Sequence, residues 1–92
     1  MIYAIHALFK PDVEARRDAL HEAFNDHLAQ PIRRIRLAGA LRGEDGVRKG
    51  VFMLIEADNP EQVRHFTDSS PYAEIYASVV VHRADVEIGH LV

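Results

Sequence analysis

The chain has 92 residues, 48% of them hydrophobic and 27% charged, with a formal net charge of −3 and no cysteine. This composition is typical of one globular domain spanning residues 1–92 and excludes a disordered chain. The acidic balance excludes a polycation that binds nucleic acid or an anionic membrane over its whole surface. The lack of cysteine excludes disulfides, thiolate metal sites and thiol catalysis. We expect a cytoplasmic protein, since the first residues also lack the basic and long apolar regions of a signal peptide.

The charge is unevenly distributed along the chain. Residues 1–50 carry nine Lys or Arg and seven Asp or Glu, whereas residues 51–92 carry two and seven. A local anion site is therefore expected in the first half. Most of the cations there follow one predicted strand, where they are typical of a solvated edge. Arg17 is the cation that we expect to meet a ligand.

Residues 2–9 are apolar apart from His6 and predict a buried strand. A helix is expected from about Asp12, which can cap its free N–H groups, to Ala29, with Pro31 as the stop. The inward face of this helix is defined by apolar residues at helical spacing, namely Val13, Leu20, Ala23, Phe24 and Leu28.

Residues 33–41 alternate and predict a half-exposed strand. The apolar face of this strand carries Ile35, Leu37, Gly39 and Leu41. Residues 43–46 read Gly-Glu-Asp-Gly, which is the signal of a hairpin turn. Residues 51–57 then form the partner strand.

A second helix is predicted to begin after Asn59, which is a good N-cap residue. Pro60 occupies its first position, and Gln62 completes a capping-box arrangement. Residues 68–71 interrupt this helix, so it is short, and Ser70 can cap one further helical turn.

Residues 78–83 predict a strand, and the tail of residues 86–92 is expected to form a fifth, shorter strand. The order β-α-β-β-α-β predicts an α+β, ferredoxin-like fold, an antiparallel sheet with both helices on one face. A lone domain of this size buries only about 60–65% of its unfolded surface. We therefore expect a second copy to cover the other sheet face, giving a homodimer or a higher homo-oligomer.

Histidine is the main candidate for chemistry near neutral pH. His27 lies roughly 20° from Leu20 around the helix and belongs to its apolar face. A shifted pKa and limited access of water suit a general acid or base there. The same position also suits a core histidine bonded to a carbonyl group. Arg17 borders this face and can either hold an anionic oxygen or cover apolar surface with its stem.

Residues 68–72 read Asp-Ser-Ser-Pro-Tyr and place a carboxylate, hydroxyls and a phenol at one helix break. Such a break can aim Asp68, Ser70 and Tyr72 at one point, or it can be a plain turn. His6 shares a strand face with apolar residues and is expected to be buried or to line a pocket. The remaining histidines show no metal-ligand spacing, so no metal site is expected.

Six segments form an ordered series along nearly the whole chain. They are Ile2-Tyr3-Ala4-Ile5-His6-Ala7, His27-Leu28-Ala29, Leu37-Ala38-Gly39-Ala40-Leu41, residues 50–57, Ser70-Pro71-Tyr72 and residues 75–81. In this order and spacing they resemble the YciI-like (YCII-related) family of the dimeric α+β barrel superfamily.

The resemblance implies a dimeric ferredoxin-like barrel with a cofactor-free pocket between sheet and helices, and chemistry by a His–Asp pair. The family histidine carries over onto His27. Ser70 stands where the family has aspartate, so Asp68 is the expected substitute. His21 is the alternative histidine, because His27 lies closer to Ala38-Gly39 than the family spacing implies. A characterised type of the family removes HCl from a chlorinated hydroxyhydroquinone in aromatic degradation.

The expected function is that of a small cofactor-free lyase or dehydrochlorinase acting on a phenolic or quinol-like molecule. The catalytic pair would be His27 and Asp68. The substrate-binding residues would be Arg17, His6, Ser70 and Tyr72. Two other functions fit the same pattern: a non-catalytic module that binds a small ligand or serves in stress, and a cofactor-free monooxygenase-like activity.

Overall fold

The computed structural model describes residues 1–30 and 34–89. Its elements are β1 (Ile2–Phe9), α1 (Glu14–Ala29), β2 (Ile35–Arg42), β3 (Arg48–Glu56), α2 (Pro60–Asp68), a 3₁₀ turn (Ala73–Ile75) and β4 (Tyr76–Ala84). The four strands form one antiparallel sheet in the order β2-β3-β1-β4. The elements follow one another in the predicted β-α-β-β-α-β order.

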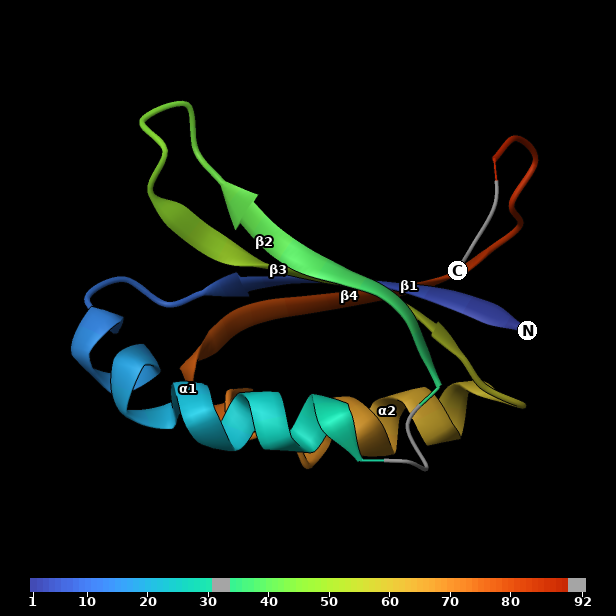
Figure 1. Ribbon diagram of the computed structural model, residues 1–92, viewed down its shortest axis with the longest axis horizontal. Helices are drawn as coiled ribbons and strands as arrows, with labels where there is room; N and C mark the ends of the chain where they lie inside the picture. Colours follow the sequence, from blue (N-terminus) through green and yellow to red (C-terminus); the bar gives the residue numbers. More distant parts are fainter. Residues whose placement is uncertain (31–33, 90–92) are drawn as a thin grey trace.

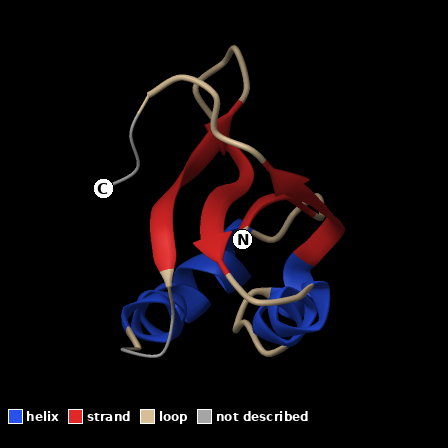
Figure 2. Cartoon of the chain, turned by 90° about the vertical axis from the view of Figure 1, so that its right-hand side faces the viewer, coloured by secondary structure: helices blue, strands red, loops and turns tan. Residues whose placement is uncertain are grey.

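Both helices pack against the same face of the sheet (Figure 1). Figure 2 shows them side by side beneath the strands, with no described helix or strand on the opposite face. The predicted ferredoxin-like α+β architecture is thus confirmed. Among the described residues, no helix is long and apolar enough to cross a membrane.

The start of α2 follows from its own sequence. The Asn59 side chain accepts a hydrogen bond from the Gln62 N–H at 3.0 Å, and Pro60 takes the first helical position, where no N–H is needed. Gln62 Oε1 accepts from the Asp58 N–H at 2.8 Å, one residue before the position that a capping box uses. The predicted N-cap is confirmed. The hydrogen bond to the Gln62 side chain comes from the Asp58 N–H, whereas a capping box would use the Asn59 N–H.

Helix α1 begins at Glu14, later than the sequence predicts. Asp12 has a φ of 60°, so the chain turns sharply there, and Val13 becomes the N-cap without a side-chain hydrogen bond. The predicted Asp12 cap is wrong, because Asp12 lies outside the cap position. The first N–H groups of α1 are therefore left without a side-chain cap. The helix ends at Ala29 as expected, whereas Pro31, the predicted stop, lies outside the described residues.

A β-bulge at Arg36 changes the faces of β2. Ile35 pairs with Ile55, whereas Leu37 pairs with Leu54, so the register shifts between the two pairs. Because one extra residue reverses the alternation of side chains, Ile35 packs against the core and Leu37 is exposed. The prediction that they share one face is wrong.

The C-terminal part of the chain also differs from the prediction. Strand β4 is longer than residues 78–83 at both ends. Residues 85–89 form no strand, and Ile88 is almost fully exposed. The predicted fifth strand is therefore absent from residues 86–89, and the rest of it lies outside the described residues.

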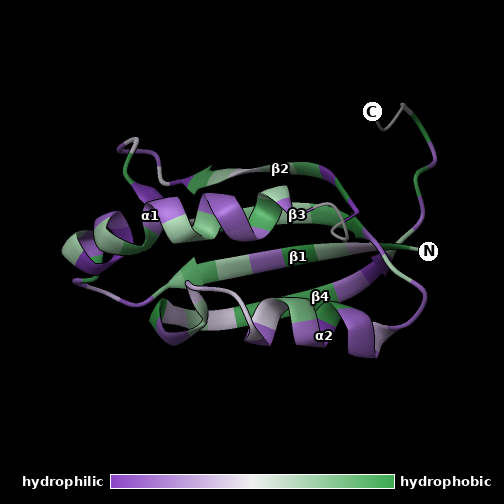
Figure 3. Ribbon diagram, turned by 60° about the horizontal axis from the view of Figure 1, so that its bottom comes forward, coloured by the Kyte–Doolittle hydropathy of each residue, from purple (hydrophilic) through white to green (hydrophobic). Residues whose placement is uncertain are grey.

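The hydrophobic core is one layer between the sheet and the helices. Buried side chains alternate along β1 and β3 and meet Val63 and Phe66 of α2. Helix α1 contributes less, because its buried residues are Phe24 and His27, and Ala23, predicted to face inward, is exposed. Figure 3 shows hydrophilic residues along the outward side of both helices.

The uncovered face of the sheet is partly apolar. Residues paired across antiparallel strands share a face, so the register places His6, Phe52 and Val80 together there. Leu8, Leu37 and Val80 are 37%, 45% and 43% exposed. A contiguous exposed apolar patch is typical of an interaction surface.

Gly50 on β3 has no room for a side chain. A Cβ atom there would lie 2.0 Å from the carbonyl oxygen of Ala7 on β1. We expect Gly50→Ala to force the two central strands apart and to lower the free energy of unfolding by about 1–3 kcal/mol, as measured by urea unfolding. Gly43→Ala is the control, since its Cβ would meet the side chains of Asp45 and Lys49 in the hairpin turn. An equal loss in both variants would contradict this explanation.

Candidate functional site

His27 is buried, as predicted, and it contacts the backbone of α2. The residue is 6% exposed, and its Nε2 lies 3.2 Å from the carbonyl oxygen of Phe66. Its ring stacks on the Phe66 ring with centroids 4.8 Å apart. Asp68 is exposed at the end of α2, and no hydrogen bond or ion pair between described residues joins it to His27. The fold brings His27 into the core without linking it to its predicted partner.

Tyr72 lies at the centre of an aromatic cluster. It is fully buried, its ring stacks on Phe24 of α1 with centroids 4.0 Å apart, and it meets Phe9 and Tyr76 edge to face. The buried Ser70 hydroxyl accepts a hydrogen bond from the Tyr72 N–H at 3.2 Å. Ser70 therefore stabilises the turn that inserts Tyr72 between α1 and the sheet.

The Tyr72 hydroxyl faces the alternative histidine. Tyr72 Oη lies 3.5 Å from Nδ1 of His21, and Asn25 Nδ2 lies 3.2 Å from Nε2 of the same ring. When Asn25 donates to Nε2, the proton of a neutral imidazole is on Nδ1, next to the phenol oxygen. The structure thus brings His21 to the Ser-Pro-Tyr segment, while His27 lies further along α1.

Two arginines act on the Tyr72 hydroxyl. Burial raises the pKa of Tyr72, and the positive charges of Arg48 and Arg17 partly oppose this effect. The Arg17 side chain is 19% exposed, and its guanidinium lies 5.8 Å from the centre of the Phe9 ring, a cation–π contact. Arg17 therefore both covers apolar surface and carries its charge toward a buried phenol.

A second buried phenol lies beside the first. Tyr76 is 8% exposed, and its Oη has no hydrogen-bond partner among the described residues. Burial raises the pKa of Tyr76 to about 12, against smaller lowering effects of the nearby Ser70 hydroxyl and the Arg48 charge. Arg48 Nε is also buried and has no hydrogen-bond partner among the described residues. Buried polar atoms without partners are rare in folded proteins and indicate a place for water or a ligand.

Two small cavities meet at Arg48. The first, of about 270 Å³, lies between α1 and the strands β2 and β3. Its lining residues are Phe24, Asn25, Leu28, Ala38, Gly39, Ala40, Arg48, Val51, Phe52 and Met53. The second, of about 250 Å³, lies beside the start of α1. Its lining residues are Phe9, Lys10, Pro11, Val13, Glu14, Arg17, Val47, Arg48 and Lys49.

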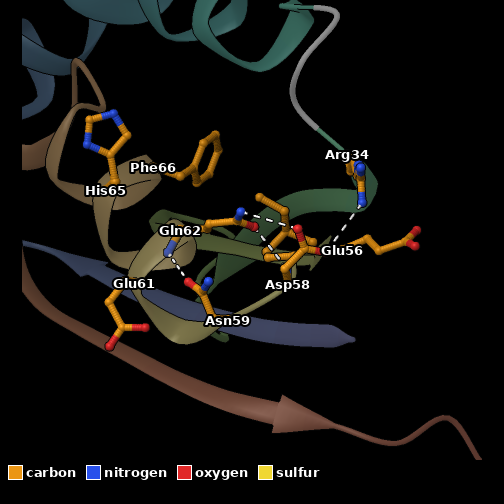
Figure 4. A pocket seen from close by; sticks show the side chains of 10 residues that line it. Arg34, Glu56, Asp58, Asn59, Glu61, Gln62, His65 and Phe66 are labelled. Atoms are coloured by element: carbon orange, nitrogen blue, oxygen red, sulfur yellow. Dashed lines mark hydrogen bonds and ion pairs between the residues drawn. The ribbon is translucent and has the colours of Figure 1, made fainter.

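A larger cavity, of about 570 Å³, lies at the N-terminal end of α2 and is shown in Figure 4. Its polar side chains largely contact one another. The Gln62 side chain donates to the Asp58 carboxylate, the Asn59 side chain accepts from the Gln62 backbone N–H, and Arg34 lies 4.0 Å from Asp58. None of the six predicted site residues lines this cavity, so it is a weaker candidate than the region around Tyr72.

His6 lies apart from these groups. It is exposed on the uncovered sheet face, between Phe52 and Val80. The expectation that His6 is buried or lines a pocket is not met within one chain, because both helices pack on the other face. Within the described ranges, no group of three or more His, Asp or Glu could hold a metal ion.

Sequence reasoning missed Arg48 and Tyr76. A register shift between Leu41 and Arg42 accompanies the pairing of Arg42 with Arg48. Such a shift reverses the alternation of β3 near its start, so Arg48 lines the cavities on the helix side. If side chains alternated strictly from Val51 back to Arg48, Arg48 would face away from the helices. The sequence pattern therefore does not predict its position. Tyr76 carried only the weak signal of an aromatic residue two positions before the predicted strand, and in the structure it is the first residue of β4.

The fold and site can be compared with known proteins. The sequence model of the YCII-related domain matches residues 1–85, and no curated protein matches the chain significantly. One similar solved structure is 5-chloro-2-hydroxyhydroquinone dehydrochlorinase (TftG) from Burkholderia phenoliruptrix AC1100 in complex with 2,5-dihydroxybenzoquinone. The match has a TM-score of 0.83 and 23% identity over 92% of this chain and 94% of that one. Another is Rv0793 from Mycobacterium tuberculosis, with a TM-score of 0.56 and 17% identity over 97% and 100%. At these identities the structural likenesses establish the fold alone.

The raised pKa of Tyr76 predicts a loss of stability in alkali. The unfolded chain releases this phenol proton near pH 10, whereas the folded chain holds it until about pH 12, so the free energy of unfolding falls between these values. Two pKa units correspond to about 2–3 kcal/mol. We expect Tyr76→Phe to remove this part of the alkaline loss and to change stability little at pH 7. Urea unfolding at pH 7, 10 and 11.5 measures both, and an unchanged pH dependence would contradict the prediction.

Proposed function

Because the chain belongs to the YCII-related domain family, we propose that it is a small enzyme that performs acid–base chemistry on a phenolic or quinol-like molecule. The supporting observation is the 3.5 Å contact of His21 Nδ1 with the buried Tyr72 hydroxyl, within the field of two guanidinium groups. An imidazole can accept a proton, and nearby cations can stabilise the oxyanion that results. We propose the cytoplasm as its compartment, since a chain without cysteine needs no oxidising environment to fold.

The reaction that we propose is the removal of HCl from a chlorinated hydroquinone. The structurally similar protein TftG is named as a dehydrochlorinase of such a compound. In 5-chloro-2-hydroxyhydroquinone, two ring hydroxyls would become carbonyl groups. One of their protons would move to the carbon that bears chlorine, and the other would leave with chloride as HCl. No external oxidant or reductant is consumed. The enzyme must take a proton from oxygen, deliver one to carbon, and stabilise the phenolate between these steps.

We assign these roles to the groups around Tyr72. His21 carries the proton: its Nδ1–H, which faces the Tyr72 hydroxyl, donates, and its Nε2 accepts once Asn25 releases it. Arg17 and Arg48 stabilise the phenolate through their charge. Tyr72 orients the ring oxygens through its hydroxyl, and the buried turn at Ser70 keeps Tyr72 in place.

The pair of His27 and Asp68 is the second assignment for the proton carrier. It is less favoured, because His27 is buried and its Nε2–H donates to the Phe66 carbonyl oxygen, which leaves only Nδ1 to accept a proton from substrate. Asp68 would also have to turn from solvent toward the core. The loss of water around its charge would cost a large amount of free energy.

Chloride release from 5-chloro-2-hydroxyhydroquinone under nitrogen tests the proposal. We expect His21→Ala to lower kcat/KM by about 10²- to 10⁴-fold without a change in the circular dichroism spectrum, since His21 is exposed. His65→Ala, the same change at an exposed histidine of α2, is the control and should retain the full rate. Activity that survives in His21→Ala but is lost in a folded His27→Gln would transfer the role to His27.

Binding without turnover is the second candidate function. Ser70 stands where the family resemblance has aspartate, and no carboxylate of a described residue is hydrogen-bonded to His21. Saturable binding of 2,5-dihydroxybenzoquinone without chloride release would favour this function. Oxygen consumption with a quinol substrate would instead favour a monooxygenase-like activity.

We also propose that a second copy of the chain covers the uncovered sheet face. Leu37 and Val80 are exposed there, and Phe52 and Leu54 are half-buried beside them. Apolar surface removed from water stabilises an interface by about 25 cal/mol per Å². A two-fold dimer would bury the same patch on both copies.

Val80→Glu tests the homodimer, because it would bury a charge in the proposed interface. We expect this variant to be monomeric and the wild type to be dimeric at micromolar concentration, as measured by sedimentation equilibrium. Val79→Glu is the matched control, since Val79 is the preceding residue of β4, is 40% exposed and pairs with Ala7 on the helix side. A monomeric wild type, or a dimer that survives Val80→Glu, would disprove the proposed interface.

A further inference from the structure

The cavity beside the start of α1 concentrates positive charge. It measures about 250 Å³, and its lining includes Lys10, Arg17, Arg48 and Lys49 but a single described carboxylate, Glu14. This excess lies in a chain whose formal net charge is −3. Like charges around one cavity repel one another, so an anion bound among them would remove an unfavourable interaction.

Two of these four cations are already engaged by the protein. Lys10 Nζ donates to the carbonyl oxygen of Glu74 at 2.9 Å. Lys49 Nζ lies 3.8 Å from the Asp45 carboxylate. Both lysines therefore belong to the local structure, and the charge that remains available is that of the arginines.

The guanidinium groups of the two arginines form fewer polar contacts with the protein. The guanidinium of Arg48 forms no hydrogen bond or ion pair with any described residue, and its Nε is buried. Arg17 meets the exposed Asp18 carboxylate at 3.9 Å and otherwise covers the Phe9 ring. A buried N–H without a partner costs free energy, which a bound acceptor would recover.

One further feature favours an anion here. The start of α1 adjoins the cavity through Val13 and Glu14, and its first N–H groups have no side-chain cap, so the positive end of the helix dipole is not neutralised by a cap.

We propose that this cavity binds the carboxylate of a small, single-ring organic anion, with Arg17 and Arg48 as its binding residues. Planar guanidinium groups match a carboxylate through parallel N–H···O bonds, which a spherical ion cannot form. The side chains of Phe9 and Val47 give the ring an apolar contact. Glu14 repels an ion of higher charge, such as phosphate.

This cavity also specifies a substrate class for the enzyme. Arg48 lines both small cavities, so an anion that it holds lies next to the space beneath α1. The substrate would be a phenol or hydroquinone that also carries a carboxylate group. This extension rests on the proposed acid–base function, whereas carboxylate binding by the cavity does not.

Titration of the ¹⁵N-labelled chain with benzoate, followed by NMR at constant ionic strength, tests the inference. We expect saturable shifts of the Arg17 and Arg48 amides with benzoate, and at least about tenfold weaker binding of benzamide, its neutral counterpart. Arg48→Met should weaken benzoate binding at least about tenfold. Arg83→Met removes the same charge from an exposed side chain outside the cavity and should change nothing.

Equal binding of benzoate and benzamide would overturn the inference, and this comparison needs no variant. Benzoate binding that persists in Arg48→Met would also overturn it. Shifts of the same size with inorganic phosphate would indicate general attraction of anions and disprove the carboxylate assignment. Benzoate binding by a chain that releases chloride from no chlorinated hydroquinone, with or without a carboxylate group, would count against the proposed function and leave this inference standing.

Discussion

The stack of Tyr72 on Phe24 is the contact on which the rest of the site depends. Phe24 is one of two buried residues of α1, so its packing against a fully buried tyrosine fixes where the helix lies over the sheet. His21 precedes Phe24 by about one helical turn and therefore meets the hydroxyl of the same ring. Aromatic pairs of this kind contribute about 0.5–1.5 kcal/mol beyond their buried area. The interaction that stabilises the domain thus also positions the candidate proton carrier.

The charges around this stack follow from burial. Burial raises the pKa values of Tyr72 and Tyr76, so both phenols are protonated and neutral at pH 7. They therefore cannot neutralise Arg17 and Arg48, whose charges are kept close to buried hydroxyl groups. A positive field that is fixed before a ligand arrives can stabilise an anion without rearrangement of the site. The proposed phenolate and carboxylate sites both depend on this arrangement.

Local rules predicted the elements that local contacts determine. The order of strands and helices and the Asn59 cap were predictable, because each depends on a few neighbouring residues. The Asp12 cap and the shared face of Ile35 and Leu37 were not, because a turn and a bulge shift the chain by one or two residues. The same kind of register shift places Arg48 on the helix side, which hid a central cation of the site.

The sequence by itself determined the β-α-β-β-α-β order, a histidine-based rather than thiol-based candidate chemistry, and a polar turn at Ser70. Only the tertiary structure decided which histidine meets that turn. His21 and His27 lie on one helix, about 120° apart around its axis, and periodicity identified the buried one. The docking of Tyr72 on Phe24 determines which side of α1 faces the turn. Periodicity describes one helix at a time, whereas a contact between distant segments depends on how they pack.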